Sequence, residues 1–219
     1  MPALTEAVKT QAAKKPPLNW LGPPLTTLRE PAFDAACARL MHLVESGFRP
    51  TVIVGIRTGG LVVARAMARA AASDLPVLPV TCQRASTATK SRLPWLRPFL
   101  SALPEAVVDA LRRLEHQLLI MRRAHKPPRQ TVNDTETAAI AEALAGIAAP
   151  RVLIADDAVD SGTTLLTVLR ALRGVCPPGT EFRTAVITQT QDYPAAQPDY
   201  ALYRGVLCRF PWSFDAARG

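Results

Sequence analysis

The sequence predicts an α/β protein with a doubly wound, mainly parallel sheet, a helical insertion and a small C-terminal hood. Two observations carry this expectation. A short apolar run at 152–155 leads through a polar turn into an apolar helical pattern at 165–172, and residues 51–72 repeat the same order of strand, turn and helix. Short uninterrupted apolar runs are typical of strands buried on both faces of a parallel sheet. We expect one domain over 31–219, preceded by an N-terminal arm at 1–30.

The individual elements follow from local patterns. Pro76 and Pro79 make the strand at 75–82 an edge strand, because proline has no N–H to donate to a neighbouring strand. Asn133 or Asp134 is the expected N-cap of the helix that follows. The expected helices lie at 34–46, 61–72, 105–124 and 135–148, and the expected strands at 51–54, 75–82, 152–155, 182–188 and within 205–213.

Composition excludes several classes of protein. The chain has 219 residues, of which 48% are hydrophobic, and no apolar run approaches the length needed to cross a bilayer. The four cysteines lie far apart, without metal-ligand spacing and without a signal peptide before them. We therefore expect reduced thiols, a cytoplasmic location and no membrane partner.

The stretch at 151–165 carries the clearest chemistry. Asp156 and Asp157 stand where the buried strand ends, and a loop of Asp160, Ser161, Gly162, Thr163 and Thr164 opens the next helix. Backbone N–H groups, hydroxyls and the positive end of a helix dipole make such a loop a phosphate cradle. The two carboxylates suit sugar hydroxyls or a divalent cation. An ordinary strand–turn–helix with Asp160 as N-cap is the alternative.

This stretch closely resembles the phosphoribosyl diphosphate (PRPP) binding signature of the type I phosphoribosyltransferases. The resemblance implies that Asp156 and Asp157 contact the ribose 2′- and 3′-hydroxyls and hold Mg²⁺, partly through substrate and water. It also implies that the loop from Asp160 to Thr164 wraps the 5′-phosphate, and that Asp160 acts as general base on the acceptor. A second possibility for Asp160 is that it only braces the loop.

The turn after the strand at 51–54 resembles the loop of this family that meets diphosphate. Gly59 and Gly60 would let the backbone approach the leaving group, and Arg57 would supply charge beside Thr58. In relatives the peptide at this loop is often cis although no proline is present. A glycine-rich turn that only packs helix on strand is the alternative.

The C-terminal residues Phe210-Pro-Trp212 resemble the ending of purine phosphoribosyltransferases, in which a tryptophan lies on the face of the base. Base stacking of Trp212 and Phe210 is therefore expected, against the alternative that Trp212 only caps the core. Those enzymes read the 6-oxo group with a lysine after the strand that follows the PRPP signature. Here Thr188, Gln189, Thr190 and Gln191 stand in its place, and Gln189 is our candidate base contact.

Almost all of the net charge of +8 lies in one segment. From residue 84 to 129 there are ten Lys and Arg against three Asp and Glu, whereas the rest of the chain carries 16 against 15. We interpret 83–129 as a basic helical insertion with a lid over the substrates at 84–92. A subunit contact and a nucleic-acid surface are the alternatives.

The predicted function is transfer of the phosphoribosyl group from PRPP to a nucleobase-like, purine-type acceptor with release of diphosphate, as in nucleotide salvage. We expect Mg²⁺ as cofactor and a homo-oligomer, a dimer. The alternative function is a regulatory PRPP-binding protein that contacts nucleic acid through the insertion, which we do not favour. A kinase or synthetase would require the ATP loop G-x-x-x-x-G-K-[ST], which does not occur.

Overall fold

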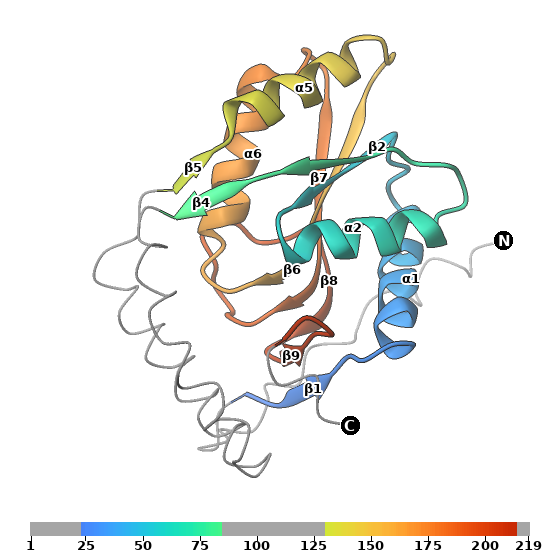
Figure 1. Cartoon of the computed structure of the whole chain (residues 1–219), viewed down its shortest axis with the longest axis vertical. Coiled ribbons are helices and arrows are strands. Elements are labelled where there is room, and N and C mark those ends of the chain that lie inside the picture. The colour runs from blue at the N-terminus through green and yellow to red at the C-terminus, as the bar shows by residue number, and fades with distance from the viewer. Residues whose placement is uncertain (1–22, 85–129, 214–219) are drawn as a thin grey trace, which may run out of the picture.

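A five-stranded parallel sheet forms the centre of the molecule (Figure 1). The computed structural model describes residues 23–84 and 130–213. Each pair of neighbouring strands runs parallel, in the spatial order β3-β2-β6-β7-β8. The strands are β2 (Val52–Ile56), β3 (Val77–Val80), β6 (Arg151–Val159), β7 (Glu181–Gln189) and β8 (Tyr200–Arg204). The predicted fold class is confirmed, and β3 lies at the sheet edge as its prolines indicated.

Helices cover both faces of this sheet. On one face α1 (Ala32–Glu45) packs on α2 (Gly59–Ala70), and on the other α5 (Asp134–Ala145) packs on α6 (Thr163–Val175), as Figure 1 shows. Side chains of β2 alternate between the two hydrophobic cores, with Ile53 in the core under α1 and α2 and Val54 in the core under α5 and α6. A strand buried on both faces has no polar face, which is why its sequence is a continuous apolar run.

A second, two-stranded sheet joins the two ends of the described chain. β1 (Leu25–Thr27) pairs in parallel with β9 (Leu207–Arg209). The N–H of Leu28 donates to the carbonyl of Arg209 over 2.8 Å, and the Leu28 side chain is buried. Residues 25–28 of the segment assigned to an N-terminal arm are thus part of the folded body.

The boundaries near the C-terminus also differ from those drawn on the sequence. The segment 198–219 was assigned to a hood, yet its β8 is the edge strand of the central sheet, where it pairs with β7. Half-buried edge strands lack a long apolar run, so β8 gives a weak sequence signal. The part of the hood outside the central sheet therefore begins after Arg204.

A short antiparallel ladder flanks the insertion in the sequence. β4 (Cys82–Arg84) pairs with β5 (Gln130–Val132), directly before the N-terminus of α5. The lid expected at 84–92 and the helix expected at 105–124 lie outside the described residues, apart from the backbone of Arg84. The roles proposed for the insertion stay predictions.

Candidate active site

The predicted phosphate loop lies at the carboxyl end of β6, where it opens α6. Gly162 has a φ of 71°, in the left-handed region that favours glycine, and its carbonyl accepts the N–H of Leu166. The hydroxyls of Ser161 and Thr163 lie 3.1 Å apart and share a hydrogen bond. The loop thus brings two hydroxyls and the N-terminal end of a helix to the same place, an arrangement suited to an anion.

The predicted diphosphate loop lies at the carboxyl end of the neighbouring strand β2. The Arg57–Thr58 peptide is cis, and Thr58 is the N-cap of α2. The backbone of Arg57 is tied to β3, since its N–H donates to the carbonyl of Val80 over 2.9 Å. Because β2 and β6 are adjacent parallel strands, the two predicted loops emerge at the same sheet edge.

The glycines of the predicted diphosphate loop approach the end of β6 closely. A Cβ placed on Gly59 would lie 2.0 Å from Oδ2 of Asp157, and one on Gly60 would lie 2.6 Å from the carbonyl oxygen of Ala155. Neither glycine has a positive φ, so the requirement for glycine is one of space. The acidic pair therefore lies directly against the diphosphate loop.

The acidic pair is held by its own backbone. Oδ1 of Asp156 accepts the N–H of Asp157 over 3.0 Å, and Oδ1 of Asp157 accepts the N–H of Ala158 over 2.9 Å. Burial raises the pKa of Asp157 above its ordinary value, although hydrogen bonds with Asp156, Ala158 and the indole of Trp212 favour the charged form. A ligand that neutralises this carboxylate or donates a hydrogen bond to it therefore offsets the free-energy cost of burying its charge.

Asp160 projects toward the end of β7. The hydroxyl of Thr190 donates to Oδ1 of Asp160 over 2.6 Å, and the N–H of Thr190 donates to the carbonyl of Val159 over 2.9 Å. The carbonyl of Ser161 also accepts the N–H of Ala195 over 2.7 Å. The segment after β7 thus holds in place both Asp160, the candidate general base, and the phosphate loop that follows it.

The side chains proposed to read the acceptor have partners within the protein. Thr188 donates its hydroxyl to the carbonyl of Val206, and Thr190 donates to Asp160. Gln189 is only 3% exposed; its amide donates to the carbonyl of Gln191 and accepts from the guanidinium of Arg204. A base that is read by Gln189 would have to displace one of these partners.

The aromatic residues at the C-terminus form one cluster beside the acidic pair. Trp212 stacks on Phe210, with ring centroids 5.0 Å apart and planes at 2°, and meets Phe33 of α1 edge-on at 5.3 Å. The indole of Trp212 also lies close enough to Asp157 to lower the pKa of that carboxyl. Phe210 is 5% exposed and Trp212 38% exposed, so Phe210 backs the indole and Trp212 is the ring open to a ligand.

Sequence reasoning missed one residue that contacts the diphosphate loop. Glu136, in the first turn of α5, lies 3.3 Å from Nε of Arg57 through Oε1. It also accepts the N–H of Thr81 over 2.5 Å and the hydroxyl of Thr81 over 3.2 Å. The only sequence signal was the spacing of Glu136 from the N-cap Asn133, which is typical of a capping box and gives no hint of Arg57.

Comparison with known protein families identifies this arrangement. The model of the phosphoribosyl transferase domain matches residues 26–216, nearly the whole chain. The chain belongs to the phosphoribosyltransferase family. The match includes both loops at the ends of β2 and β6 as well as the aromatic cluster at the C-terminus. No curated protein matches the chain in sequence.

Solved structures with the same fold are distant in sequence from this phosphoribosyltransferase. A purine phosphoribosyltransferase from Pyrococcus horikoshii is 17% identical, with a TM-score of 0.54 over 86% of this chain and 93% of that one. The xanthine-guanine-hypoxanthine phosphoribosyltransferase of Helicobacter pylori is 16% identical, with a TM-score of 0.53 over 87% and 95%. A hypothetical protein from Neisseria gonorrhoeae with bound ppGpp is 15% identical, with a TM-score of 0.54 over 90% and 92%.

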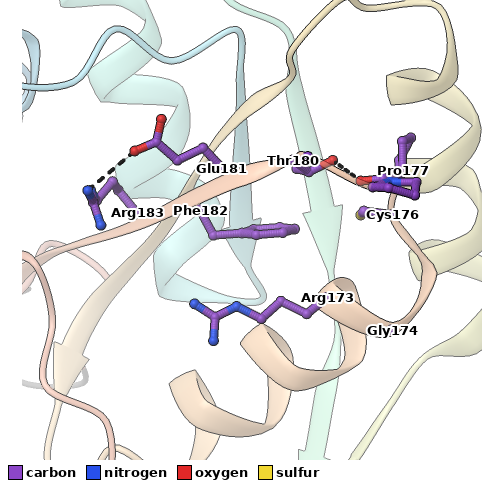
Figure 2. Close-up of a pocket in the computed structure, with 10 residues that line it drawn as sticks. Arg173, Gly174, Cys176, Pro177, Thr180, Glu181, Phe182 and Arg183 are labelled. Atoms are coloured by element: carbon purple, nitrogen blue, oxygen red, sulfur yellow. Dashed lines mark hydrogen bonds and ion pairs between the residues drawn. The ribbon is translucent and has the colours of Figure 1, made fainter.

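A surface pocket of about 740 Å³ lies at the opposite end of this phosphoribosyltransferase (Figure 2). The turn between α6 and β7 lines it, so it belongs to the amino ends of the parallel strands, away from both loops. Figure 2 shows Glu181 directed at Arg183, with which it forms an ion pair of 3.3 Å. Ligands of such sheets bind beyond the carboxyl ends of the strands, so the two loops, and not this pocket, form the candidate active site.

The described residues set two further limits on the site. Residues 23–84 and 130–213 contain no group of three or more His, Cys, Asp and Glu side chains placed to hold a metal ion. None of their helices is long and apolar enough to cross a membrane.

Proposed function

We propose that this phosphoribosyltransferase transfers the phosphoribosyl group of PRPP to a ring nitrogen of a purine-type base and releases diphosphate. The observation that carries the proposal is the contact between the acidic pair and the diphosphate loop, where Asp157 meets Gly59. PRPP presents a ribose between a 5′-phosphate and a diphosphate. A site that binds it must place hydroxyl acceptors between two anion-binding loops, and the Asp156–Asp157 pair lies between the loops of β2 and β6.

Each part of the site has a role in this reaction. The carboxylates of Asp156 and Asp157 accept hydrogen bonds from the ribose hydroxyls, and the loop from Asp160 to Thr164 holds the 5′-phosphate. Arg57 and the backbone of Thr58, Gly59 and Gly60 bind the diphosphate. These contacts hold C1 of the ribose in place for an acceptor nitrogen, and such positioning is itself a large share of catalysis.

Bond exchange takes place at C1 of the ribose. The bond from C1 to the diphosphate oxygen breaks while the bond from C1 to the acceptor nitrogen forms, through a transition state with oxocarbenium character. Asp160 takes the proton that the acceptor nitrogen loses, a role typically worth about 10²–10⁴-fold. The hydrogen bond from Thr190 to Oδ1 orients this carboxylate.

The acidic pair fits a magnesium ion that is shared with the substrate. Mg²⁺ prefers oxygen ligands and is commonly held by one or two carboxylates together with phosphate oxygens and waters. Asp156 and Asp157 supply two carboxylates, and the described residues offer no third acidic, histidine or cysteine side chain at that place. When bound, the ion would neutralise charge on the diphosphate.

The purine-type acceptor rests on the aromatic cluster and on the fold. Trp212 is the partly exposed ring next to Asp157, and stacking of a nucleobase on an aromatic ring is worth about 1–3 kcal/mol. The two named enzymes among the solved neighbours act on purines or on xanthine, guanine and hypoxanthine. Because no lysine follows β7, the acceptor need not carry the 6-oxo group that such a lysine reads.

A panel of bases tests the proposal. The full chain is incubated with PRPP, Mg²⁺ and one base at a time, diphosphate release is followed, and the product is identified by mass spectrometry. We expect release with at least one purine and a product heavier than that base by one phosphoribosyl group.

The control is the Asp156→Asn, Asp157→Asn double variant, which should keep its fold and lose most of its affinity for PRPP in calorimetry. Unchanged PRPP affinity in this variant would contradict the assignment of the acidic pair. Diphosphate release with none of the bases, together with intact PRPP binding, would contradict transfer to a base.

A further inference from the structure

We infer that Glu136 is a positioning residue of this enzyme, which sets the orientation of Arg57 for the diphosphate of PRPP. The inference rests on the proposed function, because it assigns Arg57 to diphosphate. It is carried by the set of donors that meet the carboxylate of Glu136, which come from two different segments that border the site.

Thr81 holds the carboxylate with two hydrogen bonds, and the backbone of Glu136 is anchored to the N-cap of α5. Oε2 accepts the N–H of Thr81 over 2.5 Å and Oε1 accepts the hydroxyl of Thr81 over 3.2 Å. The N–H of Glu136 donates to Oδ1 of the N-cap Asn133 over 3.0 Å, and the N–H of Asn133 donates to the carbonyl of Thr81 over 3.0 Å. Glu136 is therefore a rigid acceptor rather than a mobile surface carboxylate, and its side chain is 21% exposed.

Arg57 meets this acceptor through Nε, at 3.3 Å from Oε1. A guanidinium is a planar fork of five N–H donors, so an ion pair at Nε restricts the orientations that the whole group adopts. This ion pair does not use the outer nitrogens Nη1 and Nη2. Two outer donors in a fixed plane match the bidentate geometry of a phosphate group.

The negative charge of Glu136 by itself is unfavourable for a site that binds diphosphate. A carboxylate next to a binding site for diphosphate repels that ligand and weakens its binding. The hydrogen bonds from Thr81 and the order that the carboxylate imposes on Arg57 are the two contributions that can offset this repulsion. Removing the charge while keeping the shape should therefore separate the two effects, because repulsion and positioning change the diphosphate affinity in opposite directions.

The experiment compares Glu136→Gln with Glu142→Gln. Both variants remove one negative charge from α5, but Glu142 lies on the exposed side of the helix. The dissociation constant of inorganic diphosphate with Mg²⁺ is measured by calorimetry on the full chain. We expect Glu136→Gln to raise it about tenfold or more, the size of one lost charge-assisted hydrogen bond, and Glu142→Gln to leave it near the wild-type value.

A second background separates positioning from a general structural defect. Arg57→Lys keeps a cation but removes the planar fork, so Glu136→Gln should have little further effect on diphosphate affinity in that background. The same loss in both backgrounds would mean that Glu136 acts only on the fold, and would overturn the inference. An unchanged or improved affinity in Glu136→Gln alone would overturn it as well.

The proposed function and the role of Glu136 can be contradicted independently of each other. A wild-type chain that binds neither PRPP nor diphosphate would overturn both proposals. A wild-type chain that binds both, with an affinity that Glu136→Gln does not weaken, would overturn only the role of Glu136.

Discussion

At the scale of single residues, the acidic pair shows a conflict between binding and stability. Burial raises the pKa of Asp157, so the folded protein bears a cost for keeping this carboxylate charged near neutral pH. We predict that Asp157→Asn stabilises the ligand-free protein at pH 8, by up to ~2 kcal/mol, while it weakens PRPP binding.

The sign of this effect follows from proton linkage. Because the folded-state pKa lies above the unfolded value of 3.8, the stability tied to this group is complete below that value and is lost as the pH rises through the folded pKa. The advantage of Asp157→Asn should therefore shrink as the pH falls toward 4. Urea unfolding of both proteins in EDTA measures it, and an advantage that grows on acidification would contradict the prediction.

Cys37 of α1 gives stability a second pH dependence, at alkaline pH. Burial, followed by the nearby charge of Asp34, raises the pKa of this fully buried thiol from 9.0 to about 12. Above pH 9 the unfolded chain releases this proton and the folded chain does not. The free energy of unfolding should therefore fall by about 1.4 kcal/mol per pH unit between 9 and 12 because of this group.

The matched comparison is Cys37→Ala, which cannot ionise at this position. Its stability deficit against the wild type should be constant below pH 9 and should narrow between pH 9 and 10 in urea unfolding. A deficit that stays constant over this interval would show that the thiol of Cys37 ionises equally in both states.

At the scale of elements, the site depends on how closely α2 approaches β6. A Cβ on Gly60 would lie 2.6 Å from the carbonyl of Ala155 and 2.8 Å from Cα of Asp156, and both are backbone atoms that cannot rotate away. We predict that Gly60→Ala pushes the diphosphate loop away from the acidic pair. It should lower stability by about 1–3 kcal/mol and weaken PRPP binding more strongly than any exposed change on α2.

The control for this change is Gly174→Ala in α6, where an added Cβ meets nothing within 4 Å. Alanine at such a helical position should stabilise the protein by about 0.5–1 kcal/mol, because glycine is the poorer helix former. Thermal unfolding and calorimetry with PRPP measure both variants. Equal behaviour of the two alanine variants would contradict the steric argument.

At the scale of the whole molecule, the β1–β9 sheet joins the first and last strands of the described residues. β9 directly precedes Phe210 of the aromatic cluster. Leu28 follows β1 and is 3% exposed, in the same core as Phe33 and Phe210. We predict that Leu28→Ala costs about 2–5 kcal/mol in unfolding free energy, the usual range for a buried leucine. It should also raise the KM for the base more than that for PRPP, since Phe33 and Phe210 support Trp212.

Leu43 of α1 is the matched control, because it is 43% exposed and Leu43→Ala should cost well under that amount. Steady-state kinetics with PRPP and the accepted base varied in turn separate the two KM values. An equal rise of both values in Leu28→Ala would contradict a specific link between this core and the base site.

The sequence alone determined the central architecture and the two loops of the site. β2, β6 and β7 were predicted because each has a run of buried apolar residues, and helices α1, α2, α5 and α6 because each has its own periodicity or cap. The signals for the acidic pair and both glycine turns are likewise contiguous in the chain. Local signals of this kind survive without knowledge of the fold, since the residues that make them are neighbours in sequence.

Only the tertiary structure decided which side chains support the site. Glu136 meets Thr81 across 55 residues, and Thr190 meets Asp160 across 30, through contacts that no local pattern announces. The pairing of β1 with β9 joins residues that are 182 positions apart in the sequence, such as Leu25 and Leu207. Contacts of the first kind exist because the carboxyl ends of neighbouring parallel strands lie side by side, although the strands are far apart in sequence. Local sequence signals therefore predict the helix, strand or turn that each segment forms. The packing of these segments decides which carboxylate contacts which arginine.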